Sequence, residues 1–428
     1  MTEKNIGVRA SGGGAKSLAL VSLGCAKNAV DLQVRAGSYL KKGWTLSPDP
    51  DRADAVIVNT CAFIASAREE AEAEIRRALA LKAAGNYSRV IVAGCYPQRY
   101  PQSAAAFPGV DEWLGVPVGW TEQKVPGLRL TGKAFAYLKI AEGCLHRCAY
   151  CAIPSIRGAY RSRPLRSILR EARALVASGC RELDVVAQDP MAWREGSLRL
   201  PDLLRRIDGI PGDFWVRVLY SYPSEITEDF LEWMRTSPHA VRYIDVPVQH
   251  TVPEVLERMN RKGAVAASRA AAERLRAAVP GVTLRITVLT GFPGETEARF
   301  RALLADLRTM AFDHLGAFAY SPEAGTPGAK MRPRPSAATA RERERQVMAQ
   351  QEAIWRERAA RLVGGEFRAL VVAPGVARLP SQAPDVDGVV LLEGPAAASL
   401  VGEFVRVRLV RRRGFDFVGH CANPPNMV

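Results

Sequence analysis

Short apolar runs alternate with amphipathic stretches along most of the chain, beginning near residue 17. Buried parallel strands read as continuous Val, Ile and Leu runs, because helices cover both of their faces. The first such runs are Leu18–Leu23, Ala55–Val58 and Arg89–Ala93, with a helical pattern over Ala67–Ala83. This order predicts an open parallel α/β sheet in residues 17–130, preceded by a mobile arm at residues 1–16.

The same alternation recurs six times in residues 131–361, after a Pro- and Gly-rich linker at Val116–Gly132. Helices are expected at Leu165–Ala177 and Glu295–Met310, and the charged helix Ala340–Leu362 leads out of the region. A closed barrel of this kind has eight strand–helix units, so six units predict a partial (β/α)6 barrel. The candidate strands are Ala136–Ile140, Glu182–Ala187, Trp215–Tyr220, Tyr243–Val248, Leu284–Leu289 and His314–Tyr320.

Residues 362–428 have a different pattern, in which short apolar or alternating runs are separated by Gly and Pro. The runs are Phe367–Val372, Asp387–Leu392, Phe404–Val410 and Phe415–Gly419. This pattern predicts a small β-barrel domain. The expected fold class is therefore a multidomain α/β protein with a small all-β domain at its carboxyl end.

Composition narrows the class of protein. Of the 428 residues, 48% are hydrophobic and 24% are charged, which excludes wholesale disorder. No apolar run approaches the roughly 20 residues of a membrane span, so we expect a cytoplasmic protein without a membrane partner. The net charge of +15 permits a polyanionic partner such as RNA without requiring one. We expect a monomer.

Three of the eight cysteines, Cys144, Cys148 and Cys151, lie within a stretch of eight residues on the loop that leaves the first candidate barrel strand. Without an export signal, such clustered cysteines indicate metal ligands rather than disulfides. Thiolates suit zinc and iron–sulfur clusters, but structural zinc needs four ligands and no second Cys-x-x-Cys occurs. An iron–sulfur cluster is favoured, and three cysteines would leave one iron of a four-iron cluster open to a small ligand.

Three other cysteines, Cys25, Cys61 and Cys95, are separated by 36 and 34 residues, and each directly follows a candidate strand. The carboxyl ends of parallel strands lie along one edge of a sheet, so these thiols can converge there. The alternative for each is an inert core thiol. Cys180 and Cys421 are interpreted as structural.

The spacing Cys-x-x-x-Cys-x-aromatic-Cys resembles that of the radical S-adenosylmethionine superfamily. The flanking runs Ala141–Cys144, Ala152–Gly158 and Arg161–Arg163 are similar to those of its methylthiotransferases. The three separated cysteines match that family's amino-terminal iron–sulfur domain, and residues 362–428 match its TRAM module. The resemblance spans roughly residues 17–425.

The resemblance implies two [4Fe-4S] clusters and S-adenosyl-L-methionine as cofactors. Cys144, Cys148 and Cys151 would hold the cluster that binds S-adenosylmethionine and cleaves it to a 5′-deoxyadenosyl radical. Cys25, Cys61 and Cys95 would hold the cluster that carries or donates the sulfur. No catalytic residue is implied beyond these ligands, and an electron donor such as flavodoxin or ferredoxin is expected.

Further candidates follow barrel strands, where the chemistry of such barrels collects. Tyr150, Gln188, Asp189 and Gln249 are expected to contact the cofactor, with Tyr150 packing against the adenine. His250 is interpreted either as a proton carrier or as a hydrogen-bonded pocket histidine. The arginines of the loop after Cys151 hold a carboxylate or phosphate, or else lie in a solvated loop. They are Arg157, Arg161 and Arg163.

The family divides by substrate between an adenosine of tRNA and the β-carbon of an aspartate in ribosomal protein S12. Ser22–Asn28 and Pro247–His250 look like the protein-modifying branch, which makes S12 or the small ribosomal subunit the expected partner and tRNA the alternative. Departures from that branch are Ala26 in place of proline, Asp31–Gln33, and Asp189–Trp193. A radical enzyme that makes a different bond, and a non-catalytic iron–sulfur RNA-binding module, are the other two hypotheses.

Overall fold

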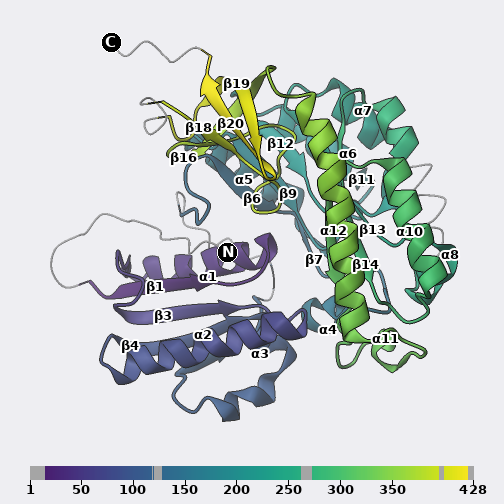
Figure 1. Cartoon of the computed structure of the whole chain (residues 1–428). Coiled ribbons are helices and arrows are strands. Elements are labelled where there is room, and N and C mark those ends of the chain that lie inside the picture. Colours follow the sequence, from purple (N-terminus) through teal and green to yellow (C-terminus); the bar gives the residue numbers. More distant parts are fainter. Residues whose placement is uncertain (1–14, 118, 120–127, 262–271, 395–399, 423–428) are drawn as a thin grey trace, which may run out of the picture. The chain divides into compact units, whose positions relative to one another are not determined.

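The computed structural model describes residues 15–117, 119, 128–261, 272–394 and 400–422 (Figure 1). By its internal packing the chain divides into two compact units. The first comprises residues 1–132, 142–146 and 151–163, and the second comprises residues 133–141, 147–150 and 164–428. All but the last two residues of the expected arm lie outside the described residues. The domain boundaries expected from the sequence stay predictions.

The first unit is built on a five-stranded parallel sheet with the strand order β2-β1-β3-β4-β5. The adjacent strands β3 and β4 are almost wholly buried, as their apolar runs predict. This confirms the open parallel α/β sheet. The strands are β1 (Ser17–Ser22), β2 (Thr45–Leu46), β3 (Ala53–Thr60), β4 (Tyr87–Gly94) and β5 (Glu112–Leu114).

Helices cover both faces of this sheet (Figure 1). Helix α1 packs Leu32 and Ala36 into the core on one face, and α2 packs Ile75 and Ala78 into the core on the other. The helices of the unit are α1 (Ala26–Leu40), α2 (Ala65–Ala83), α3 (Cys95–Arg99), the 3₁₀ turn η1 (Pro101–Ala106) and α4 (Ile153–Arg157). Two short strands, β7 (Ala141–Glu142) and β8 (Arg161–Ser162), flank the cysteine loop in sequence.

The second unit contains six parallel strands in the order β6-β9-β12-β13-β14-β15. Within the described chain the outer strands β6 and β15 do not pair with each other, so the barrel is open. The predicted partial barrel of six units is confirmed. The strands are β6 (Phe135–Lys139), β9 (Glu182–Val186), β12 (Trp215–Val218), β13 (Ala240–Gln249), β14 (Thr283–Thr290) and β15 (His314–Ala319).

The helices of this unit follow the amphipathic stretches of the sequence. Helix α5 has the predicted bounds, whereas α10 begins two residues after the predicted Glu295, because the Thr296 hydroxyl accepts the Arg299 N–H as an N-cap. None of the helices among the described residues is long and apolar enough to cross a membrane. The helices are α5 (Leu165–Ala177), α6 (Leu200–Asp208), η2 (Pro223–Glu225), α7 (Glu228–Thr236), α8 (Pro253–Arg258), α10 (Glu297–Met310), α11 (Pro327–Lys330) and α12 (Ala337–Ala360). A short hairpin of β10 (Arg194–Glu195) and β11 (Leu198–Arg199) precedes α6.

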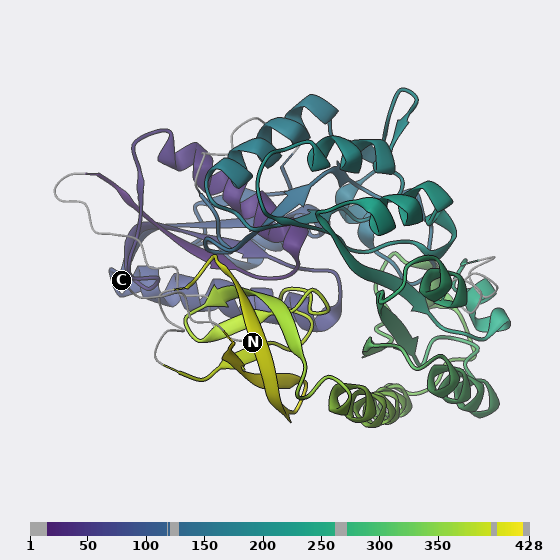
Figure 2. The same ribbon diagram turned by 90° about the horizontal axis from the view of Figure 1, so that it is seen from above.

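The carboxyl-terminal strands form a closed barrel in the order β16-β17-β18-β20-β19, drawn in yellow-green to yellow in Figure 2. This confirms the small β-barrel. Strand β17 was not predicted, because its three residues are too few to show an alternating pattern. The strands are β16 (Glu366–Ala373), β17 (Val376–Arg378), β18 (Val390–Leu392), β19 (Phe404–Arg413) and β20 (Asp416–Cys421).

The segment Arg378–Asp387 joins this small barrel to the strands of the partial barrel through buried polar contacts. Arg378 pairs with Glu182, the first residue of β9. The hydroxyl of Tyr137 donates to Asp385 over 2.8 Å, and that of Tyr243 donates to Asp387 over 2.6 Å. These partners lie in the first half or at the middle of their strands, so the contacts leave clear the carboxyl ends, where such barrels carry out chemistry.

Candidate cysteine sites and family

Cys25, Cys61 and Cys95 lie at the carboxyl ends of three neighbouring strands of the first unit. Strands β1, β3 and β4 are adjacent, and each cysteine follows its strand within three residues. All three are free thiols, with Cys25 exposed and Cys95 buried. The predicted position at one sheet edge is what the structure shows, and their role as ligands stays a prediction.

Close packing brings the Cys25 and Cys61 loops together. Gly24 has a φ of +90°, and a Cβ added there would lie 2.9 Å from the Cβ of Cys61. Asn28 ties the same loops together, because its amide donates to the carbonyls of Leu23 and Thr60 over 2.7 and 3.1 Å. The sequence did not single out Asn28, whose only signal was its place three residues after Cys25.

Arg157 reaches this edge from α4. Its Nη2 lies 3.1 Å from Cys95 Sγ and 3.3 Å from Asn28 Oδ1, and its Nη1 lies 2.5 Å from Asp31 Oδ2. Glu142 is a second carboxylate partner at 3.4 Å. Of the two interpretations of Arg157, the solvated loop is wrong, because the side chain is buried, and the carboxylates that it holds are acids of this chain.

The three thiols differ in their electrostatic surroundings. The protein around Cys25 desolvates its sulfur, but Lys27, Arg157 and a hydrogen bond from the backbone of Asn28 outweigh this and lower the pKa of Cys25. Burial raises the pKa of Cys61, and it raises the pKa of Cys95 to about 12. Each of these pKa values also responds to at least one of the other thiols or to Arg157, so the three sulfurs share one neighbourhood.

Cys144, Cys148 and Cys151 occupy the loop that follows β6 and β7. Within the second unit, the stretch around Cys148 is fixed by backbone contacts, since Ala149 donates to the carbonyl of Met259 over 2.9 Å and Gly328 donates to that of Ala149 over 2.7 Å. Cys148 is buried, with Nη1 of Arg261 at 3.6 Å from its sulfur. Arg261 was not predicted from the sequence.

Tyr150 lies beside this arginine. Its hydroxyl is 3.4 Å from Nη1 of Arg261, and its ring meets that of Phe292 edge-on with 6.4 Å between centroids. The guanidinium of Arg261 also stacks over the ring of Tyr222 at 4.4 Å. A polar and aromatic surface therefore adjoins Cys148, and the predicted contact of Tyr150 with adenine stays a prediction.

The other predicted pocket residues lie where barrel strands end. Gln188 and Asp189 follow β9, and Gln249 ends β13 with a φ of 69°. His250 is fully buried, and its Nδ1 accepts the N–H of Val252 over 3.0 Å. The cofactor contacts expected of Gln188, Asp189 and Gln249 stay predictions.

Glu295 faces the other ring nitrogen of His250. Nε2 of His250 is 3.3 Å from Oε2 of Glu295 without a hydrogen bond between them, and the other oxygen of Glu295 is 2.7 Å from Nη1 of Arg343. The hydrogen bond that His250 makes through Nδ1 favours the second interpretation, a hydrogen-bonded pocket histidine.

The donor chemistry fits iron–sulfur clusters. The six cysteines of the two groups take part in no disulfide, and thiolates are the ligands that such clusters prefer. No group of three or more Cys, His, Asp or Glu side chains in the described part of the chain is arranged around a single metal ion. The three protein ligands of a four-iron cluster bind different irons, so they do not need to meet at one point.

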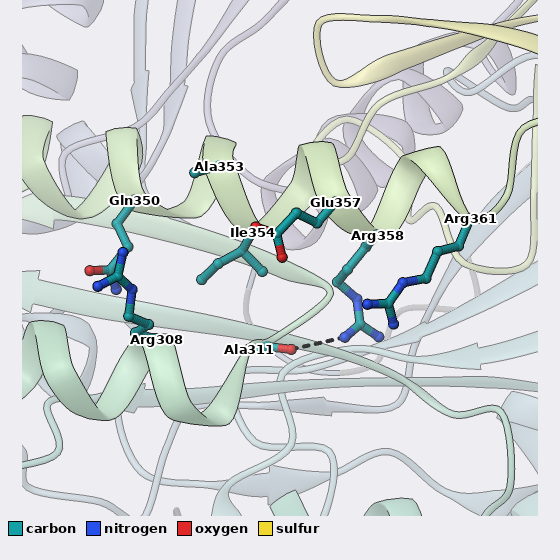
Figure 3. Close-up of a pocket in the computed structure, with 8 residues that line it drawn as sticks. All are labelled: Arg308, Ala311, Gln350, Ala353, Ile354, Glu357, Arg358 and Arg361. Carbon is teal, nitrogen blue, oxygen red and sulfur yellow. Dashed lines mark hydrogen bonds between the residues drawn. The ribbon is translucent and has the colours of Figure 1, made fainter.

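A cavity of about 340 Å³ lies between α10 and α12, and none of the predicted site residues lines it (Figure 3). Its lining is partly polar and partly apolar and includes Arg308, Arg358 and Arg361. Arg358 is used internally, since it donates to the carbonyl of Ala311 over 3.1 Å at the end of α10. The cavity holds no cysteine and is not the site of the chemistry.

Comparison with known proteins gives the family. Residues 138–307 match the radical SAM superfamily, residues 17–115 match the uncharacterized protein family UPF0004, and residues 363–422 match the TRAM domain. The ribosomal protein uS12 methylthiotransferase RimO of Moorella thermoacetica is 42% identical over 94% of this chain and 98% of its own. The protein of the same name from Syntrophus aciditrophicus is 38% identical over 96% and 99%. The chain belongs to the uS12 methylthiotransferase family.

Solved structures agree with this fold. The radical S-adenosylmethionine methyltransferase TsrM from Kitasatospora setae matches with a TM-score of 0.50 at 17% identity, over 90% of this chain and 82% of that one. The cobalamin-dependent radical enzyme OxsB matches with a TM-score of 0.51 at 12% identity, over 80% and 56%. As a radical S-adenosylmethionine methylthiotransferase, the chain uses a [4Fe-4S] cluster and S-adenosylmethionine.

Proposed function

We propose that this protein adds a methylthio group to the β-carbon of an aspartate in ribosomal protein S12. The observation that carries the proposal is the match over nearly the whole chain to relatives named for that activity. All three parts of the chain match in order, so the likeness is not confined to the widespread radical domain. Modification of a tRNA adenosine is not favoured, because these relatives are named for the ribosomal protein.

Cys144, Cys148 and Cys151 are the proposed ligands of the cluster that binds S-adenosylmethionine. When bound, the cofactors would supply a 5′-deoxyadenosyl radical that removes hydrogen from the substrate carbon, a sulfur that bonds to this carbon, and a methyl group for that sulfur from another S-adenosylmethionine. The chain's own contribution is orientation and exclusion of water. Met259 and Gly328 hold the Cys148 segment by backbone hydrogen bonds. In our proposal Tyr150, Gln188, Asp189 and Gln249 contact S-adenosylmethionine at the ends of the barrel strands.

Cys25, Cys61 and Cys95 are the proposed ligands of a second [4Fe-4S] cluster, from which the sulfur is transferred. Their place on three adjacent strand ends supports this assignment. A second support is the packing of Gly24 against Cys61, which leaves no space for a larger residue between the two cysteine loops. Cys180 and Cys421 remain structural in this proposal.

The proposed partners follow from the same assignment. S12, free or within the small ribosomal subunit, is the substrate, and the TRAM domain at residues 363–422 suits a contact with RNA of that subunit. We also propose that flavodoxin or ferredoxin delivers the electron, and that the protein works as a monomer in the cytoplasm.

The test is anaerobic reconstitution with iron and sulfide, followed by separate reactions with S12 and with unmodified or isopentenylated tRNA. Mass spectrometry should show a methylthio-for-hydrogen gain on an aspartyl peptide of S12 and none on tRNA. A gain on adenosine alone would refute the proposed substrate. Formation of 5′-deoxyadenosine without either product would refute methylthio transfer to both.

Two variants separate the roles of the cysteine groups. Cys61→Ala should abolish thiolation and leave some cleavage of S-adenosylmethionine. Cys421→Ala is the matched control, because Cys421 is also a free, partly buried thiol but lies in β20. Loss of both activities in Cys61→Ala would contradict the separate roles of the two clusters.

A further inference from the structure

Each proposed cluster site has one cysteine sulfur in contact with a buried arginine. Nη2 of Arg157 is 3.1 Å from Cys95, and Nη1 of Arg261 is 3.6 Å from Cys148. Both arginines are 3% exposed. A neutral thiol is a weak acceptor, so a buried guanidinium gains little from it, whereas a thiolate or cluster sulfur is a far better acceptor.

Arg157 is held in the orientation that this contact needs. Asp31 and Glu142 both pair with Nη1, and Nη2 is thereby directed to Cys95 and to the Oδ1 of Asn28. The carboxylates compensate the cost of burying the guanidinium. Glu142 comes two residues before Cys144, so Arg157 also contacts the segment that leads into the other cysteine group.

We propose that Arg157 is a positioning residue for the second cluster, which it stabilises in its reduced form by donating a hydrogen bond to the Cys95 sulfur. The inference rests on the proposed function. Adding an electron makes a cluster more negative, so a cationic donor at one of its sulfurs favours the reduced state and raises the midpoint potential. Arg261 has the matching place at Cys148 and serves as the control.

The experiment isolates the second cluster in the full chain by the changes Cys144→Ala, Cys148→Ala and Cys151→Ala. After anaerobic reconstitution, iron and sulfide per chain and the midpoint potential are measured. Arg157→Gln should lower the ratio of reduced to oxidised cluster at least tenfold at a fixed potential, which equals 59 mV for a one-electron couple. Arg157→Lys should give a smaller shift, and Arg261→Gln should give none.

Arg157→Gln leaves two buried carboxylates without their arginine, so Asp31→Asn combined with Arg157→Gln provides a variant with restored charge balance. A lowered potential in this double variant would support the proposal. The proposal would be overturned if Arg157→Gln or the double variant held a cluster with the same midpoint potential as the triple cysteine variant. It would also be overturned if every Arg157 variant lost the cluster. If the triple cysteine variant with Arg157 intact holds no cluster, the proposal of a second cluster is itself refuted. This outcome is distinct from one in which the cluster is present but its potential does not depend on Arg157.

Discussion

Replacing Glu182 tests how the carboxyl-terminal barrel is anchored to the partial barrel. Glu182 is fully buried, and its carboxylate pairs with Arg378 of the small barrel and, over 2.8 Å, with Nε of Arg217. Arg217 in turn donates to the carbonyl of Pro380 over 2.9 Å. One carboxylate therefore neutralises two buried arginines that join the two barrels.

The expected cost of Glu182→Gln follows from these contacts. Two charges about 4 Å apart attract each other by about 4 kcal/mol at an effective dielectric constant near 20. Removing one partner of a buried pair costs about 3–5 kcal/mol, because a charge is left without compensation. We therefore expect the free energy of unfolding of the second unit to fall by about 3–5 kcal/mol.

The assay is urea denaturation of the full chain, followed by fluorescence and circular dichroism. The control is Asp213→Ala, which removes the exposed ion pair of Asp213 with Arg368 between the same two barrels. Exposed pairs of this type contribute about 0–1 kcal/mol. A loss for Glu182→Gln no larger than that for Asp213→Ala would refute the reasoning.

Three further predictions test other parts of the structure. Burial and the neighbouring Glu182 raise the pKa of Asp184, so the ionised carboxylate destabilises the fold increasingly as the pH rises above the pKa that Asp184 has in the unfolded chain. Asp184→Asn should therefore flatten the fall in melting temperature between pH 5 and 8. An unchanged slope would contradict this. Gly24→Ala should reduce iron loading of the proposed site at Cys25, Cys61 and Cys95, because the added Cβ would meet Cys61. The control is Gly43→Ala, where φ is +84° and the space around the Cβ is open, so that only the backbone strain of about 1–3 kcal/mol is expected. His250→Asn should lower the free energy of unfolding by about 1–3 kcal/mol and leave the pH profile of 5′-deoxyadenosine formation unchanged. A shifted pH profile would instead support the interpretation of His250 as a proton carrier.

The fold could be predicted largely from the sequence because buried strands and amphipathic helices leave strong local patterns. Helix α5 has its predicted bounds, and all six strands of the partial barrel lie where the apolar runs are. The predicted ends of strands are wrong where the tertiary structure, and not the local pattern, determines where a strand stops. Strand β12 stops at Val218 although the predicted run continues to Tyr220, and Tyr220 has a φ of 71°, outside the extended region of the backbone.

The sheet edge at which Cys25, Cys61 and Cys95 lie could be predicted for a related reason. A cysteine directly after a buried strand is at the carboxyl end of that strand, and parallel pairing then brings such ends to one edge. Arg157 was noticed only as one of three loop arginines, and Arg261 was not noticed. Their contacts with Cys95 and Cys148 join residues 62 and 113 positions apart, and no local periodicity records such pairs.

The two arginines show what the fold adds to the ligand pattern. Cysteine spacing specifies which sulfurs can hold a cluster, but the potential of a cluster depends on hydrogen bonds and charges around those sulfurs. Those groups come from elsewhere in the chain, namely the end of α4 for Cys95 and the residues after α8 for Cys148. Two sites with similar thiol ligands can therefore acquire different redox properties, which the cofactor-cleaving and sulfur-donating roles that we propose for them would use.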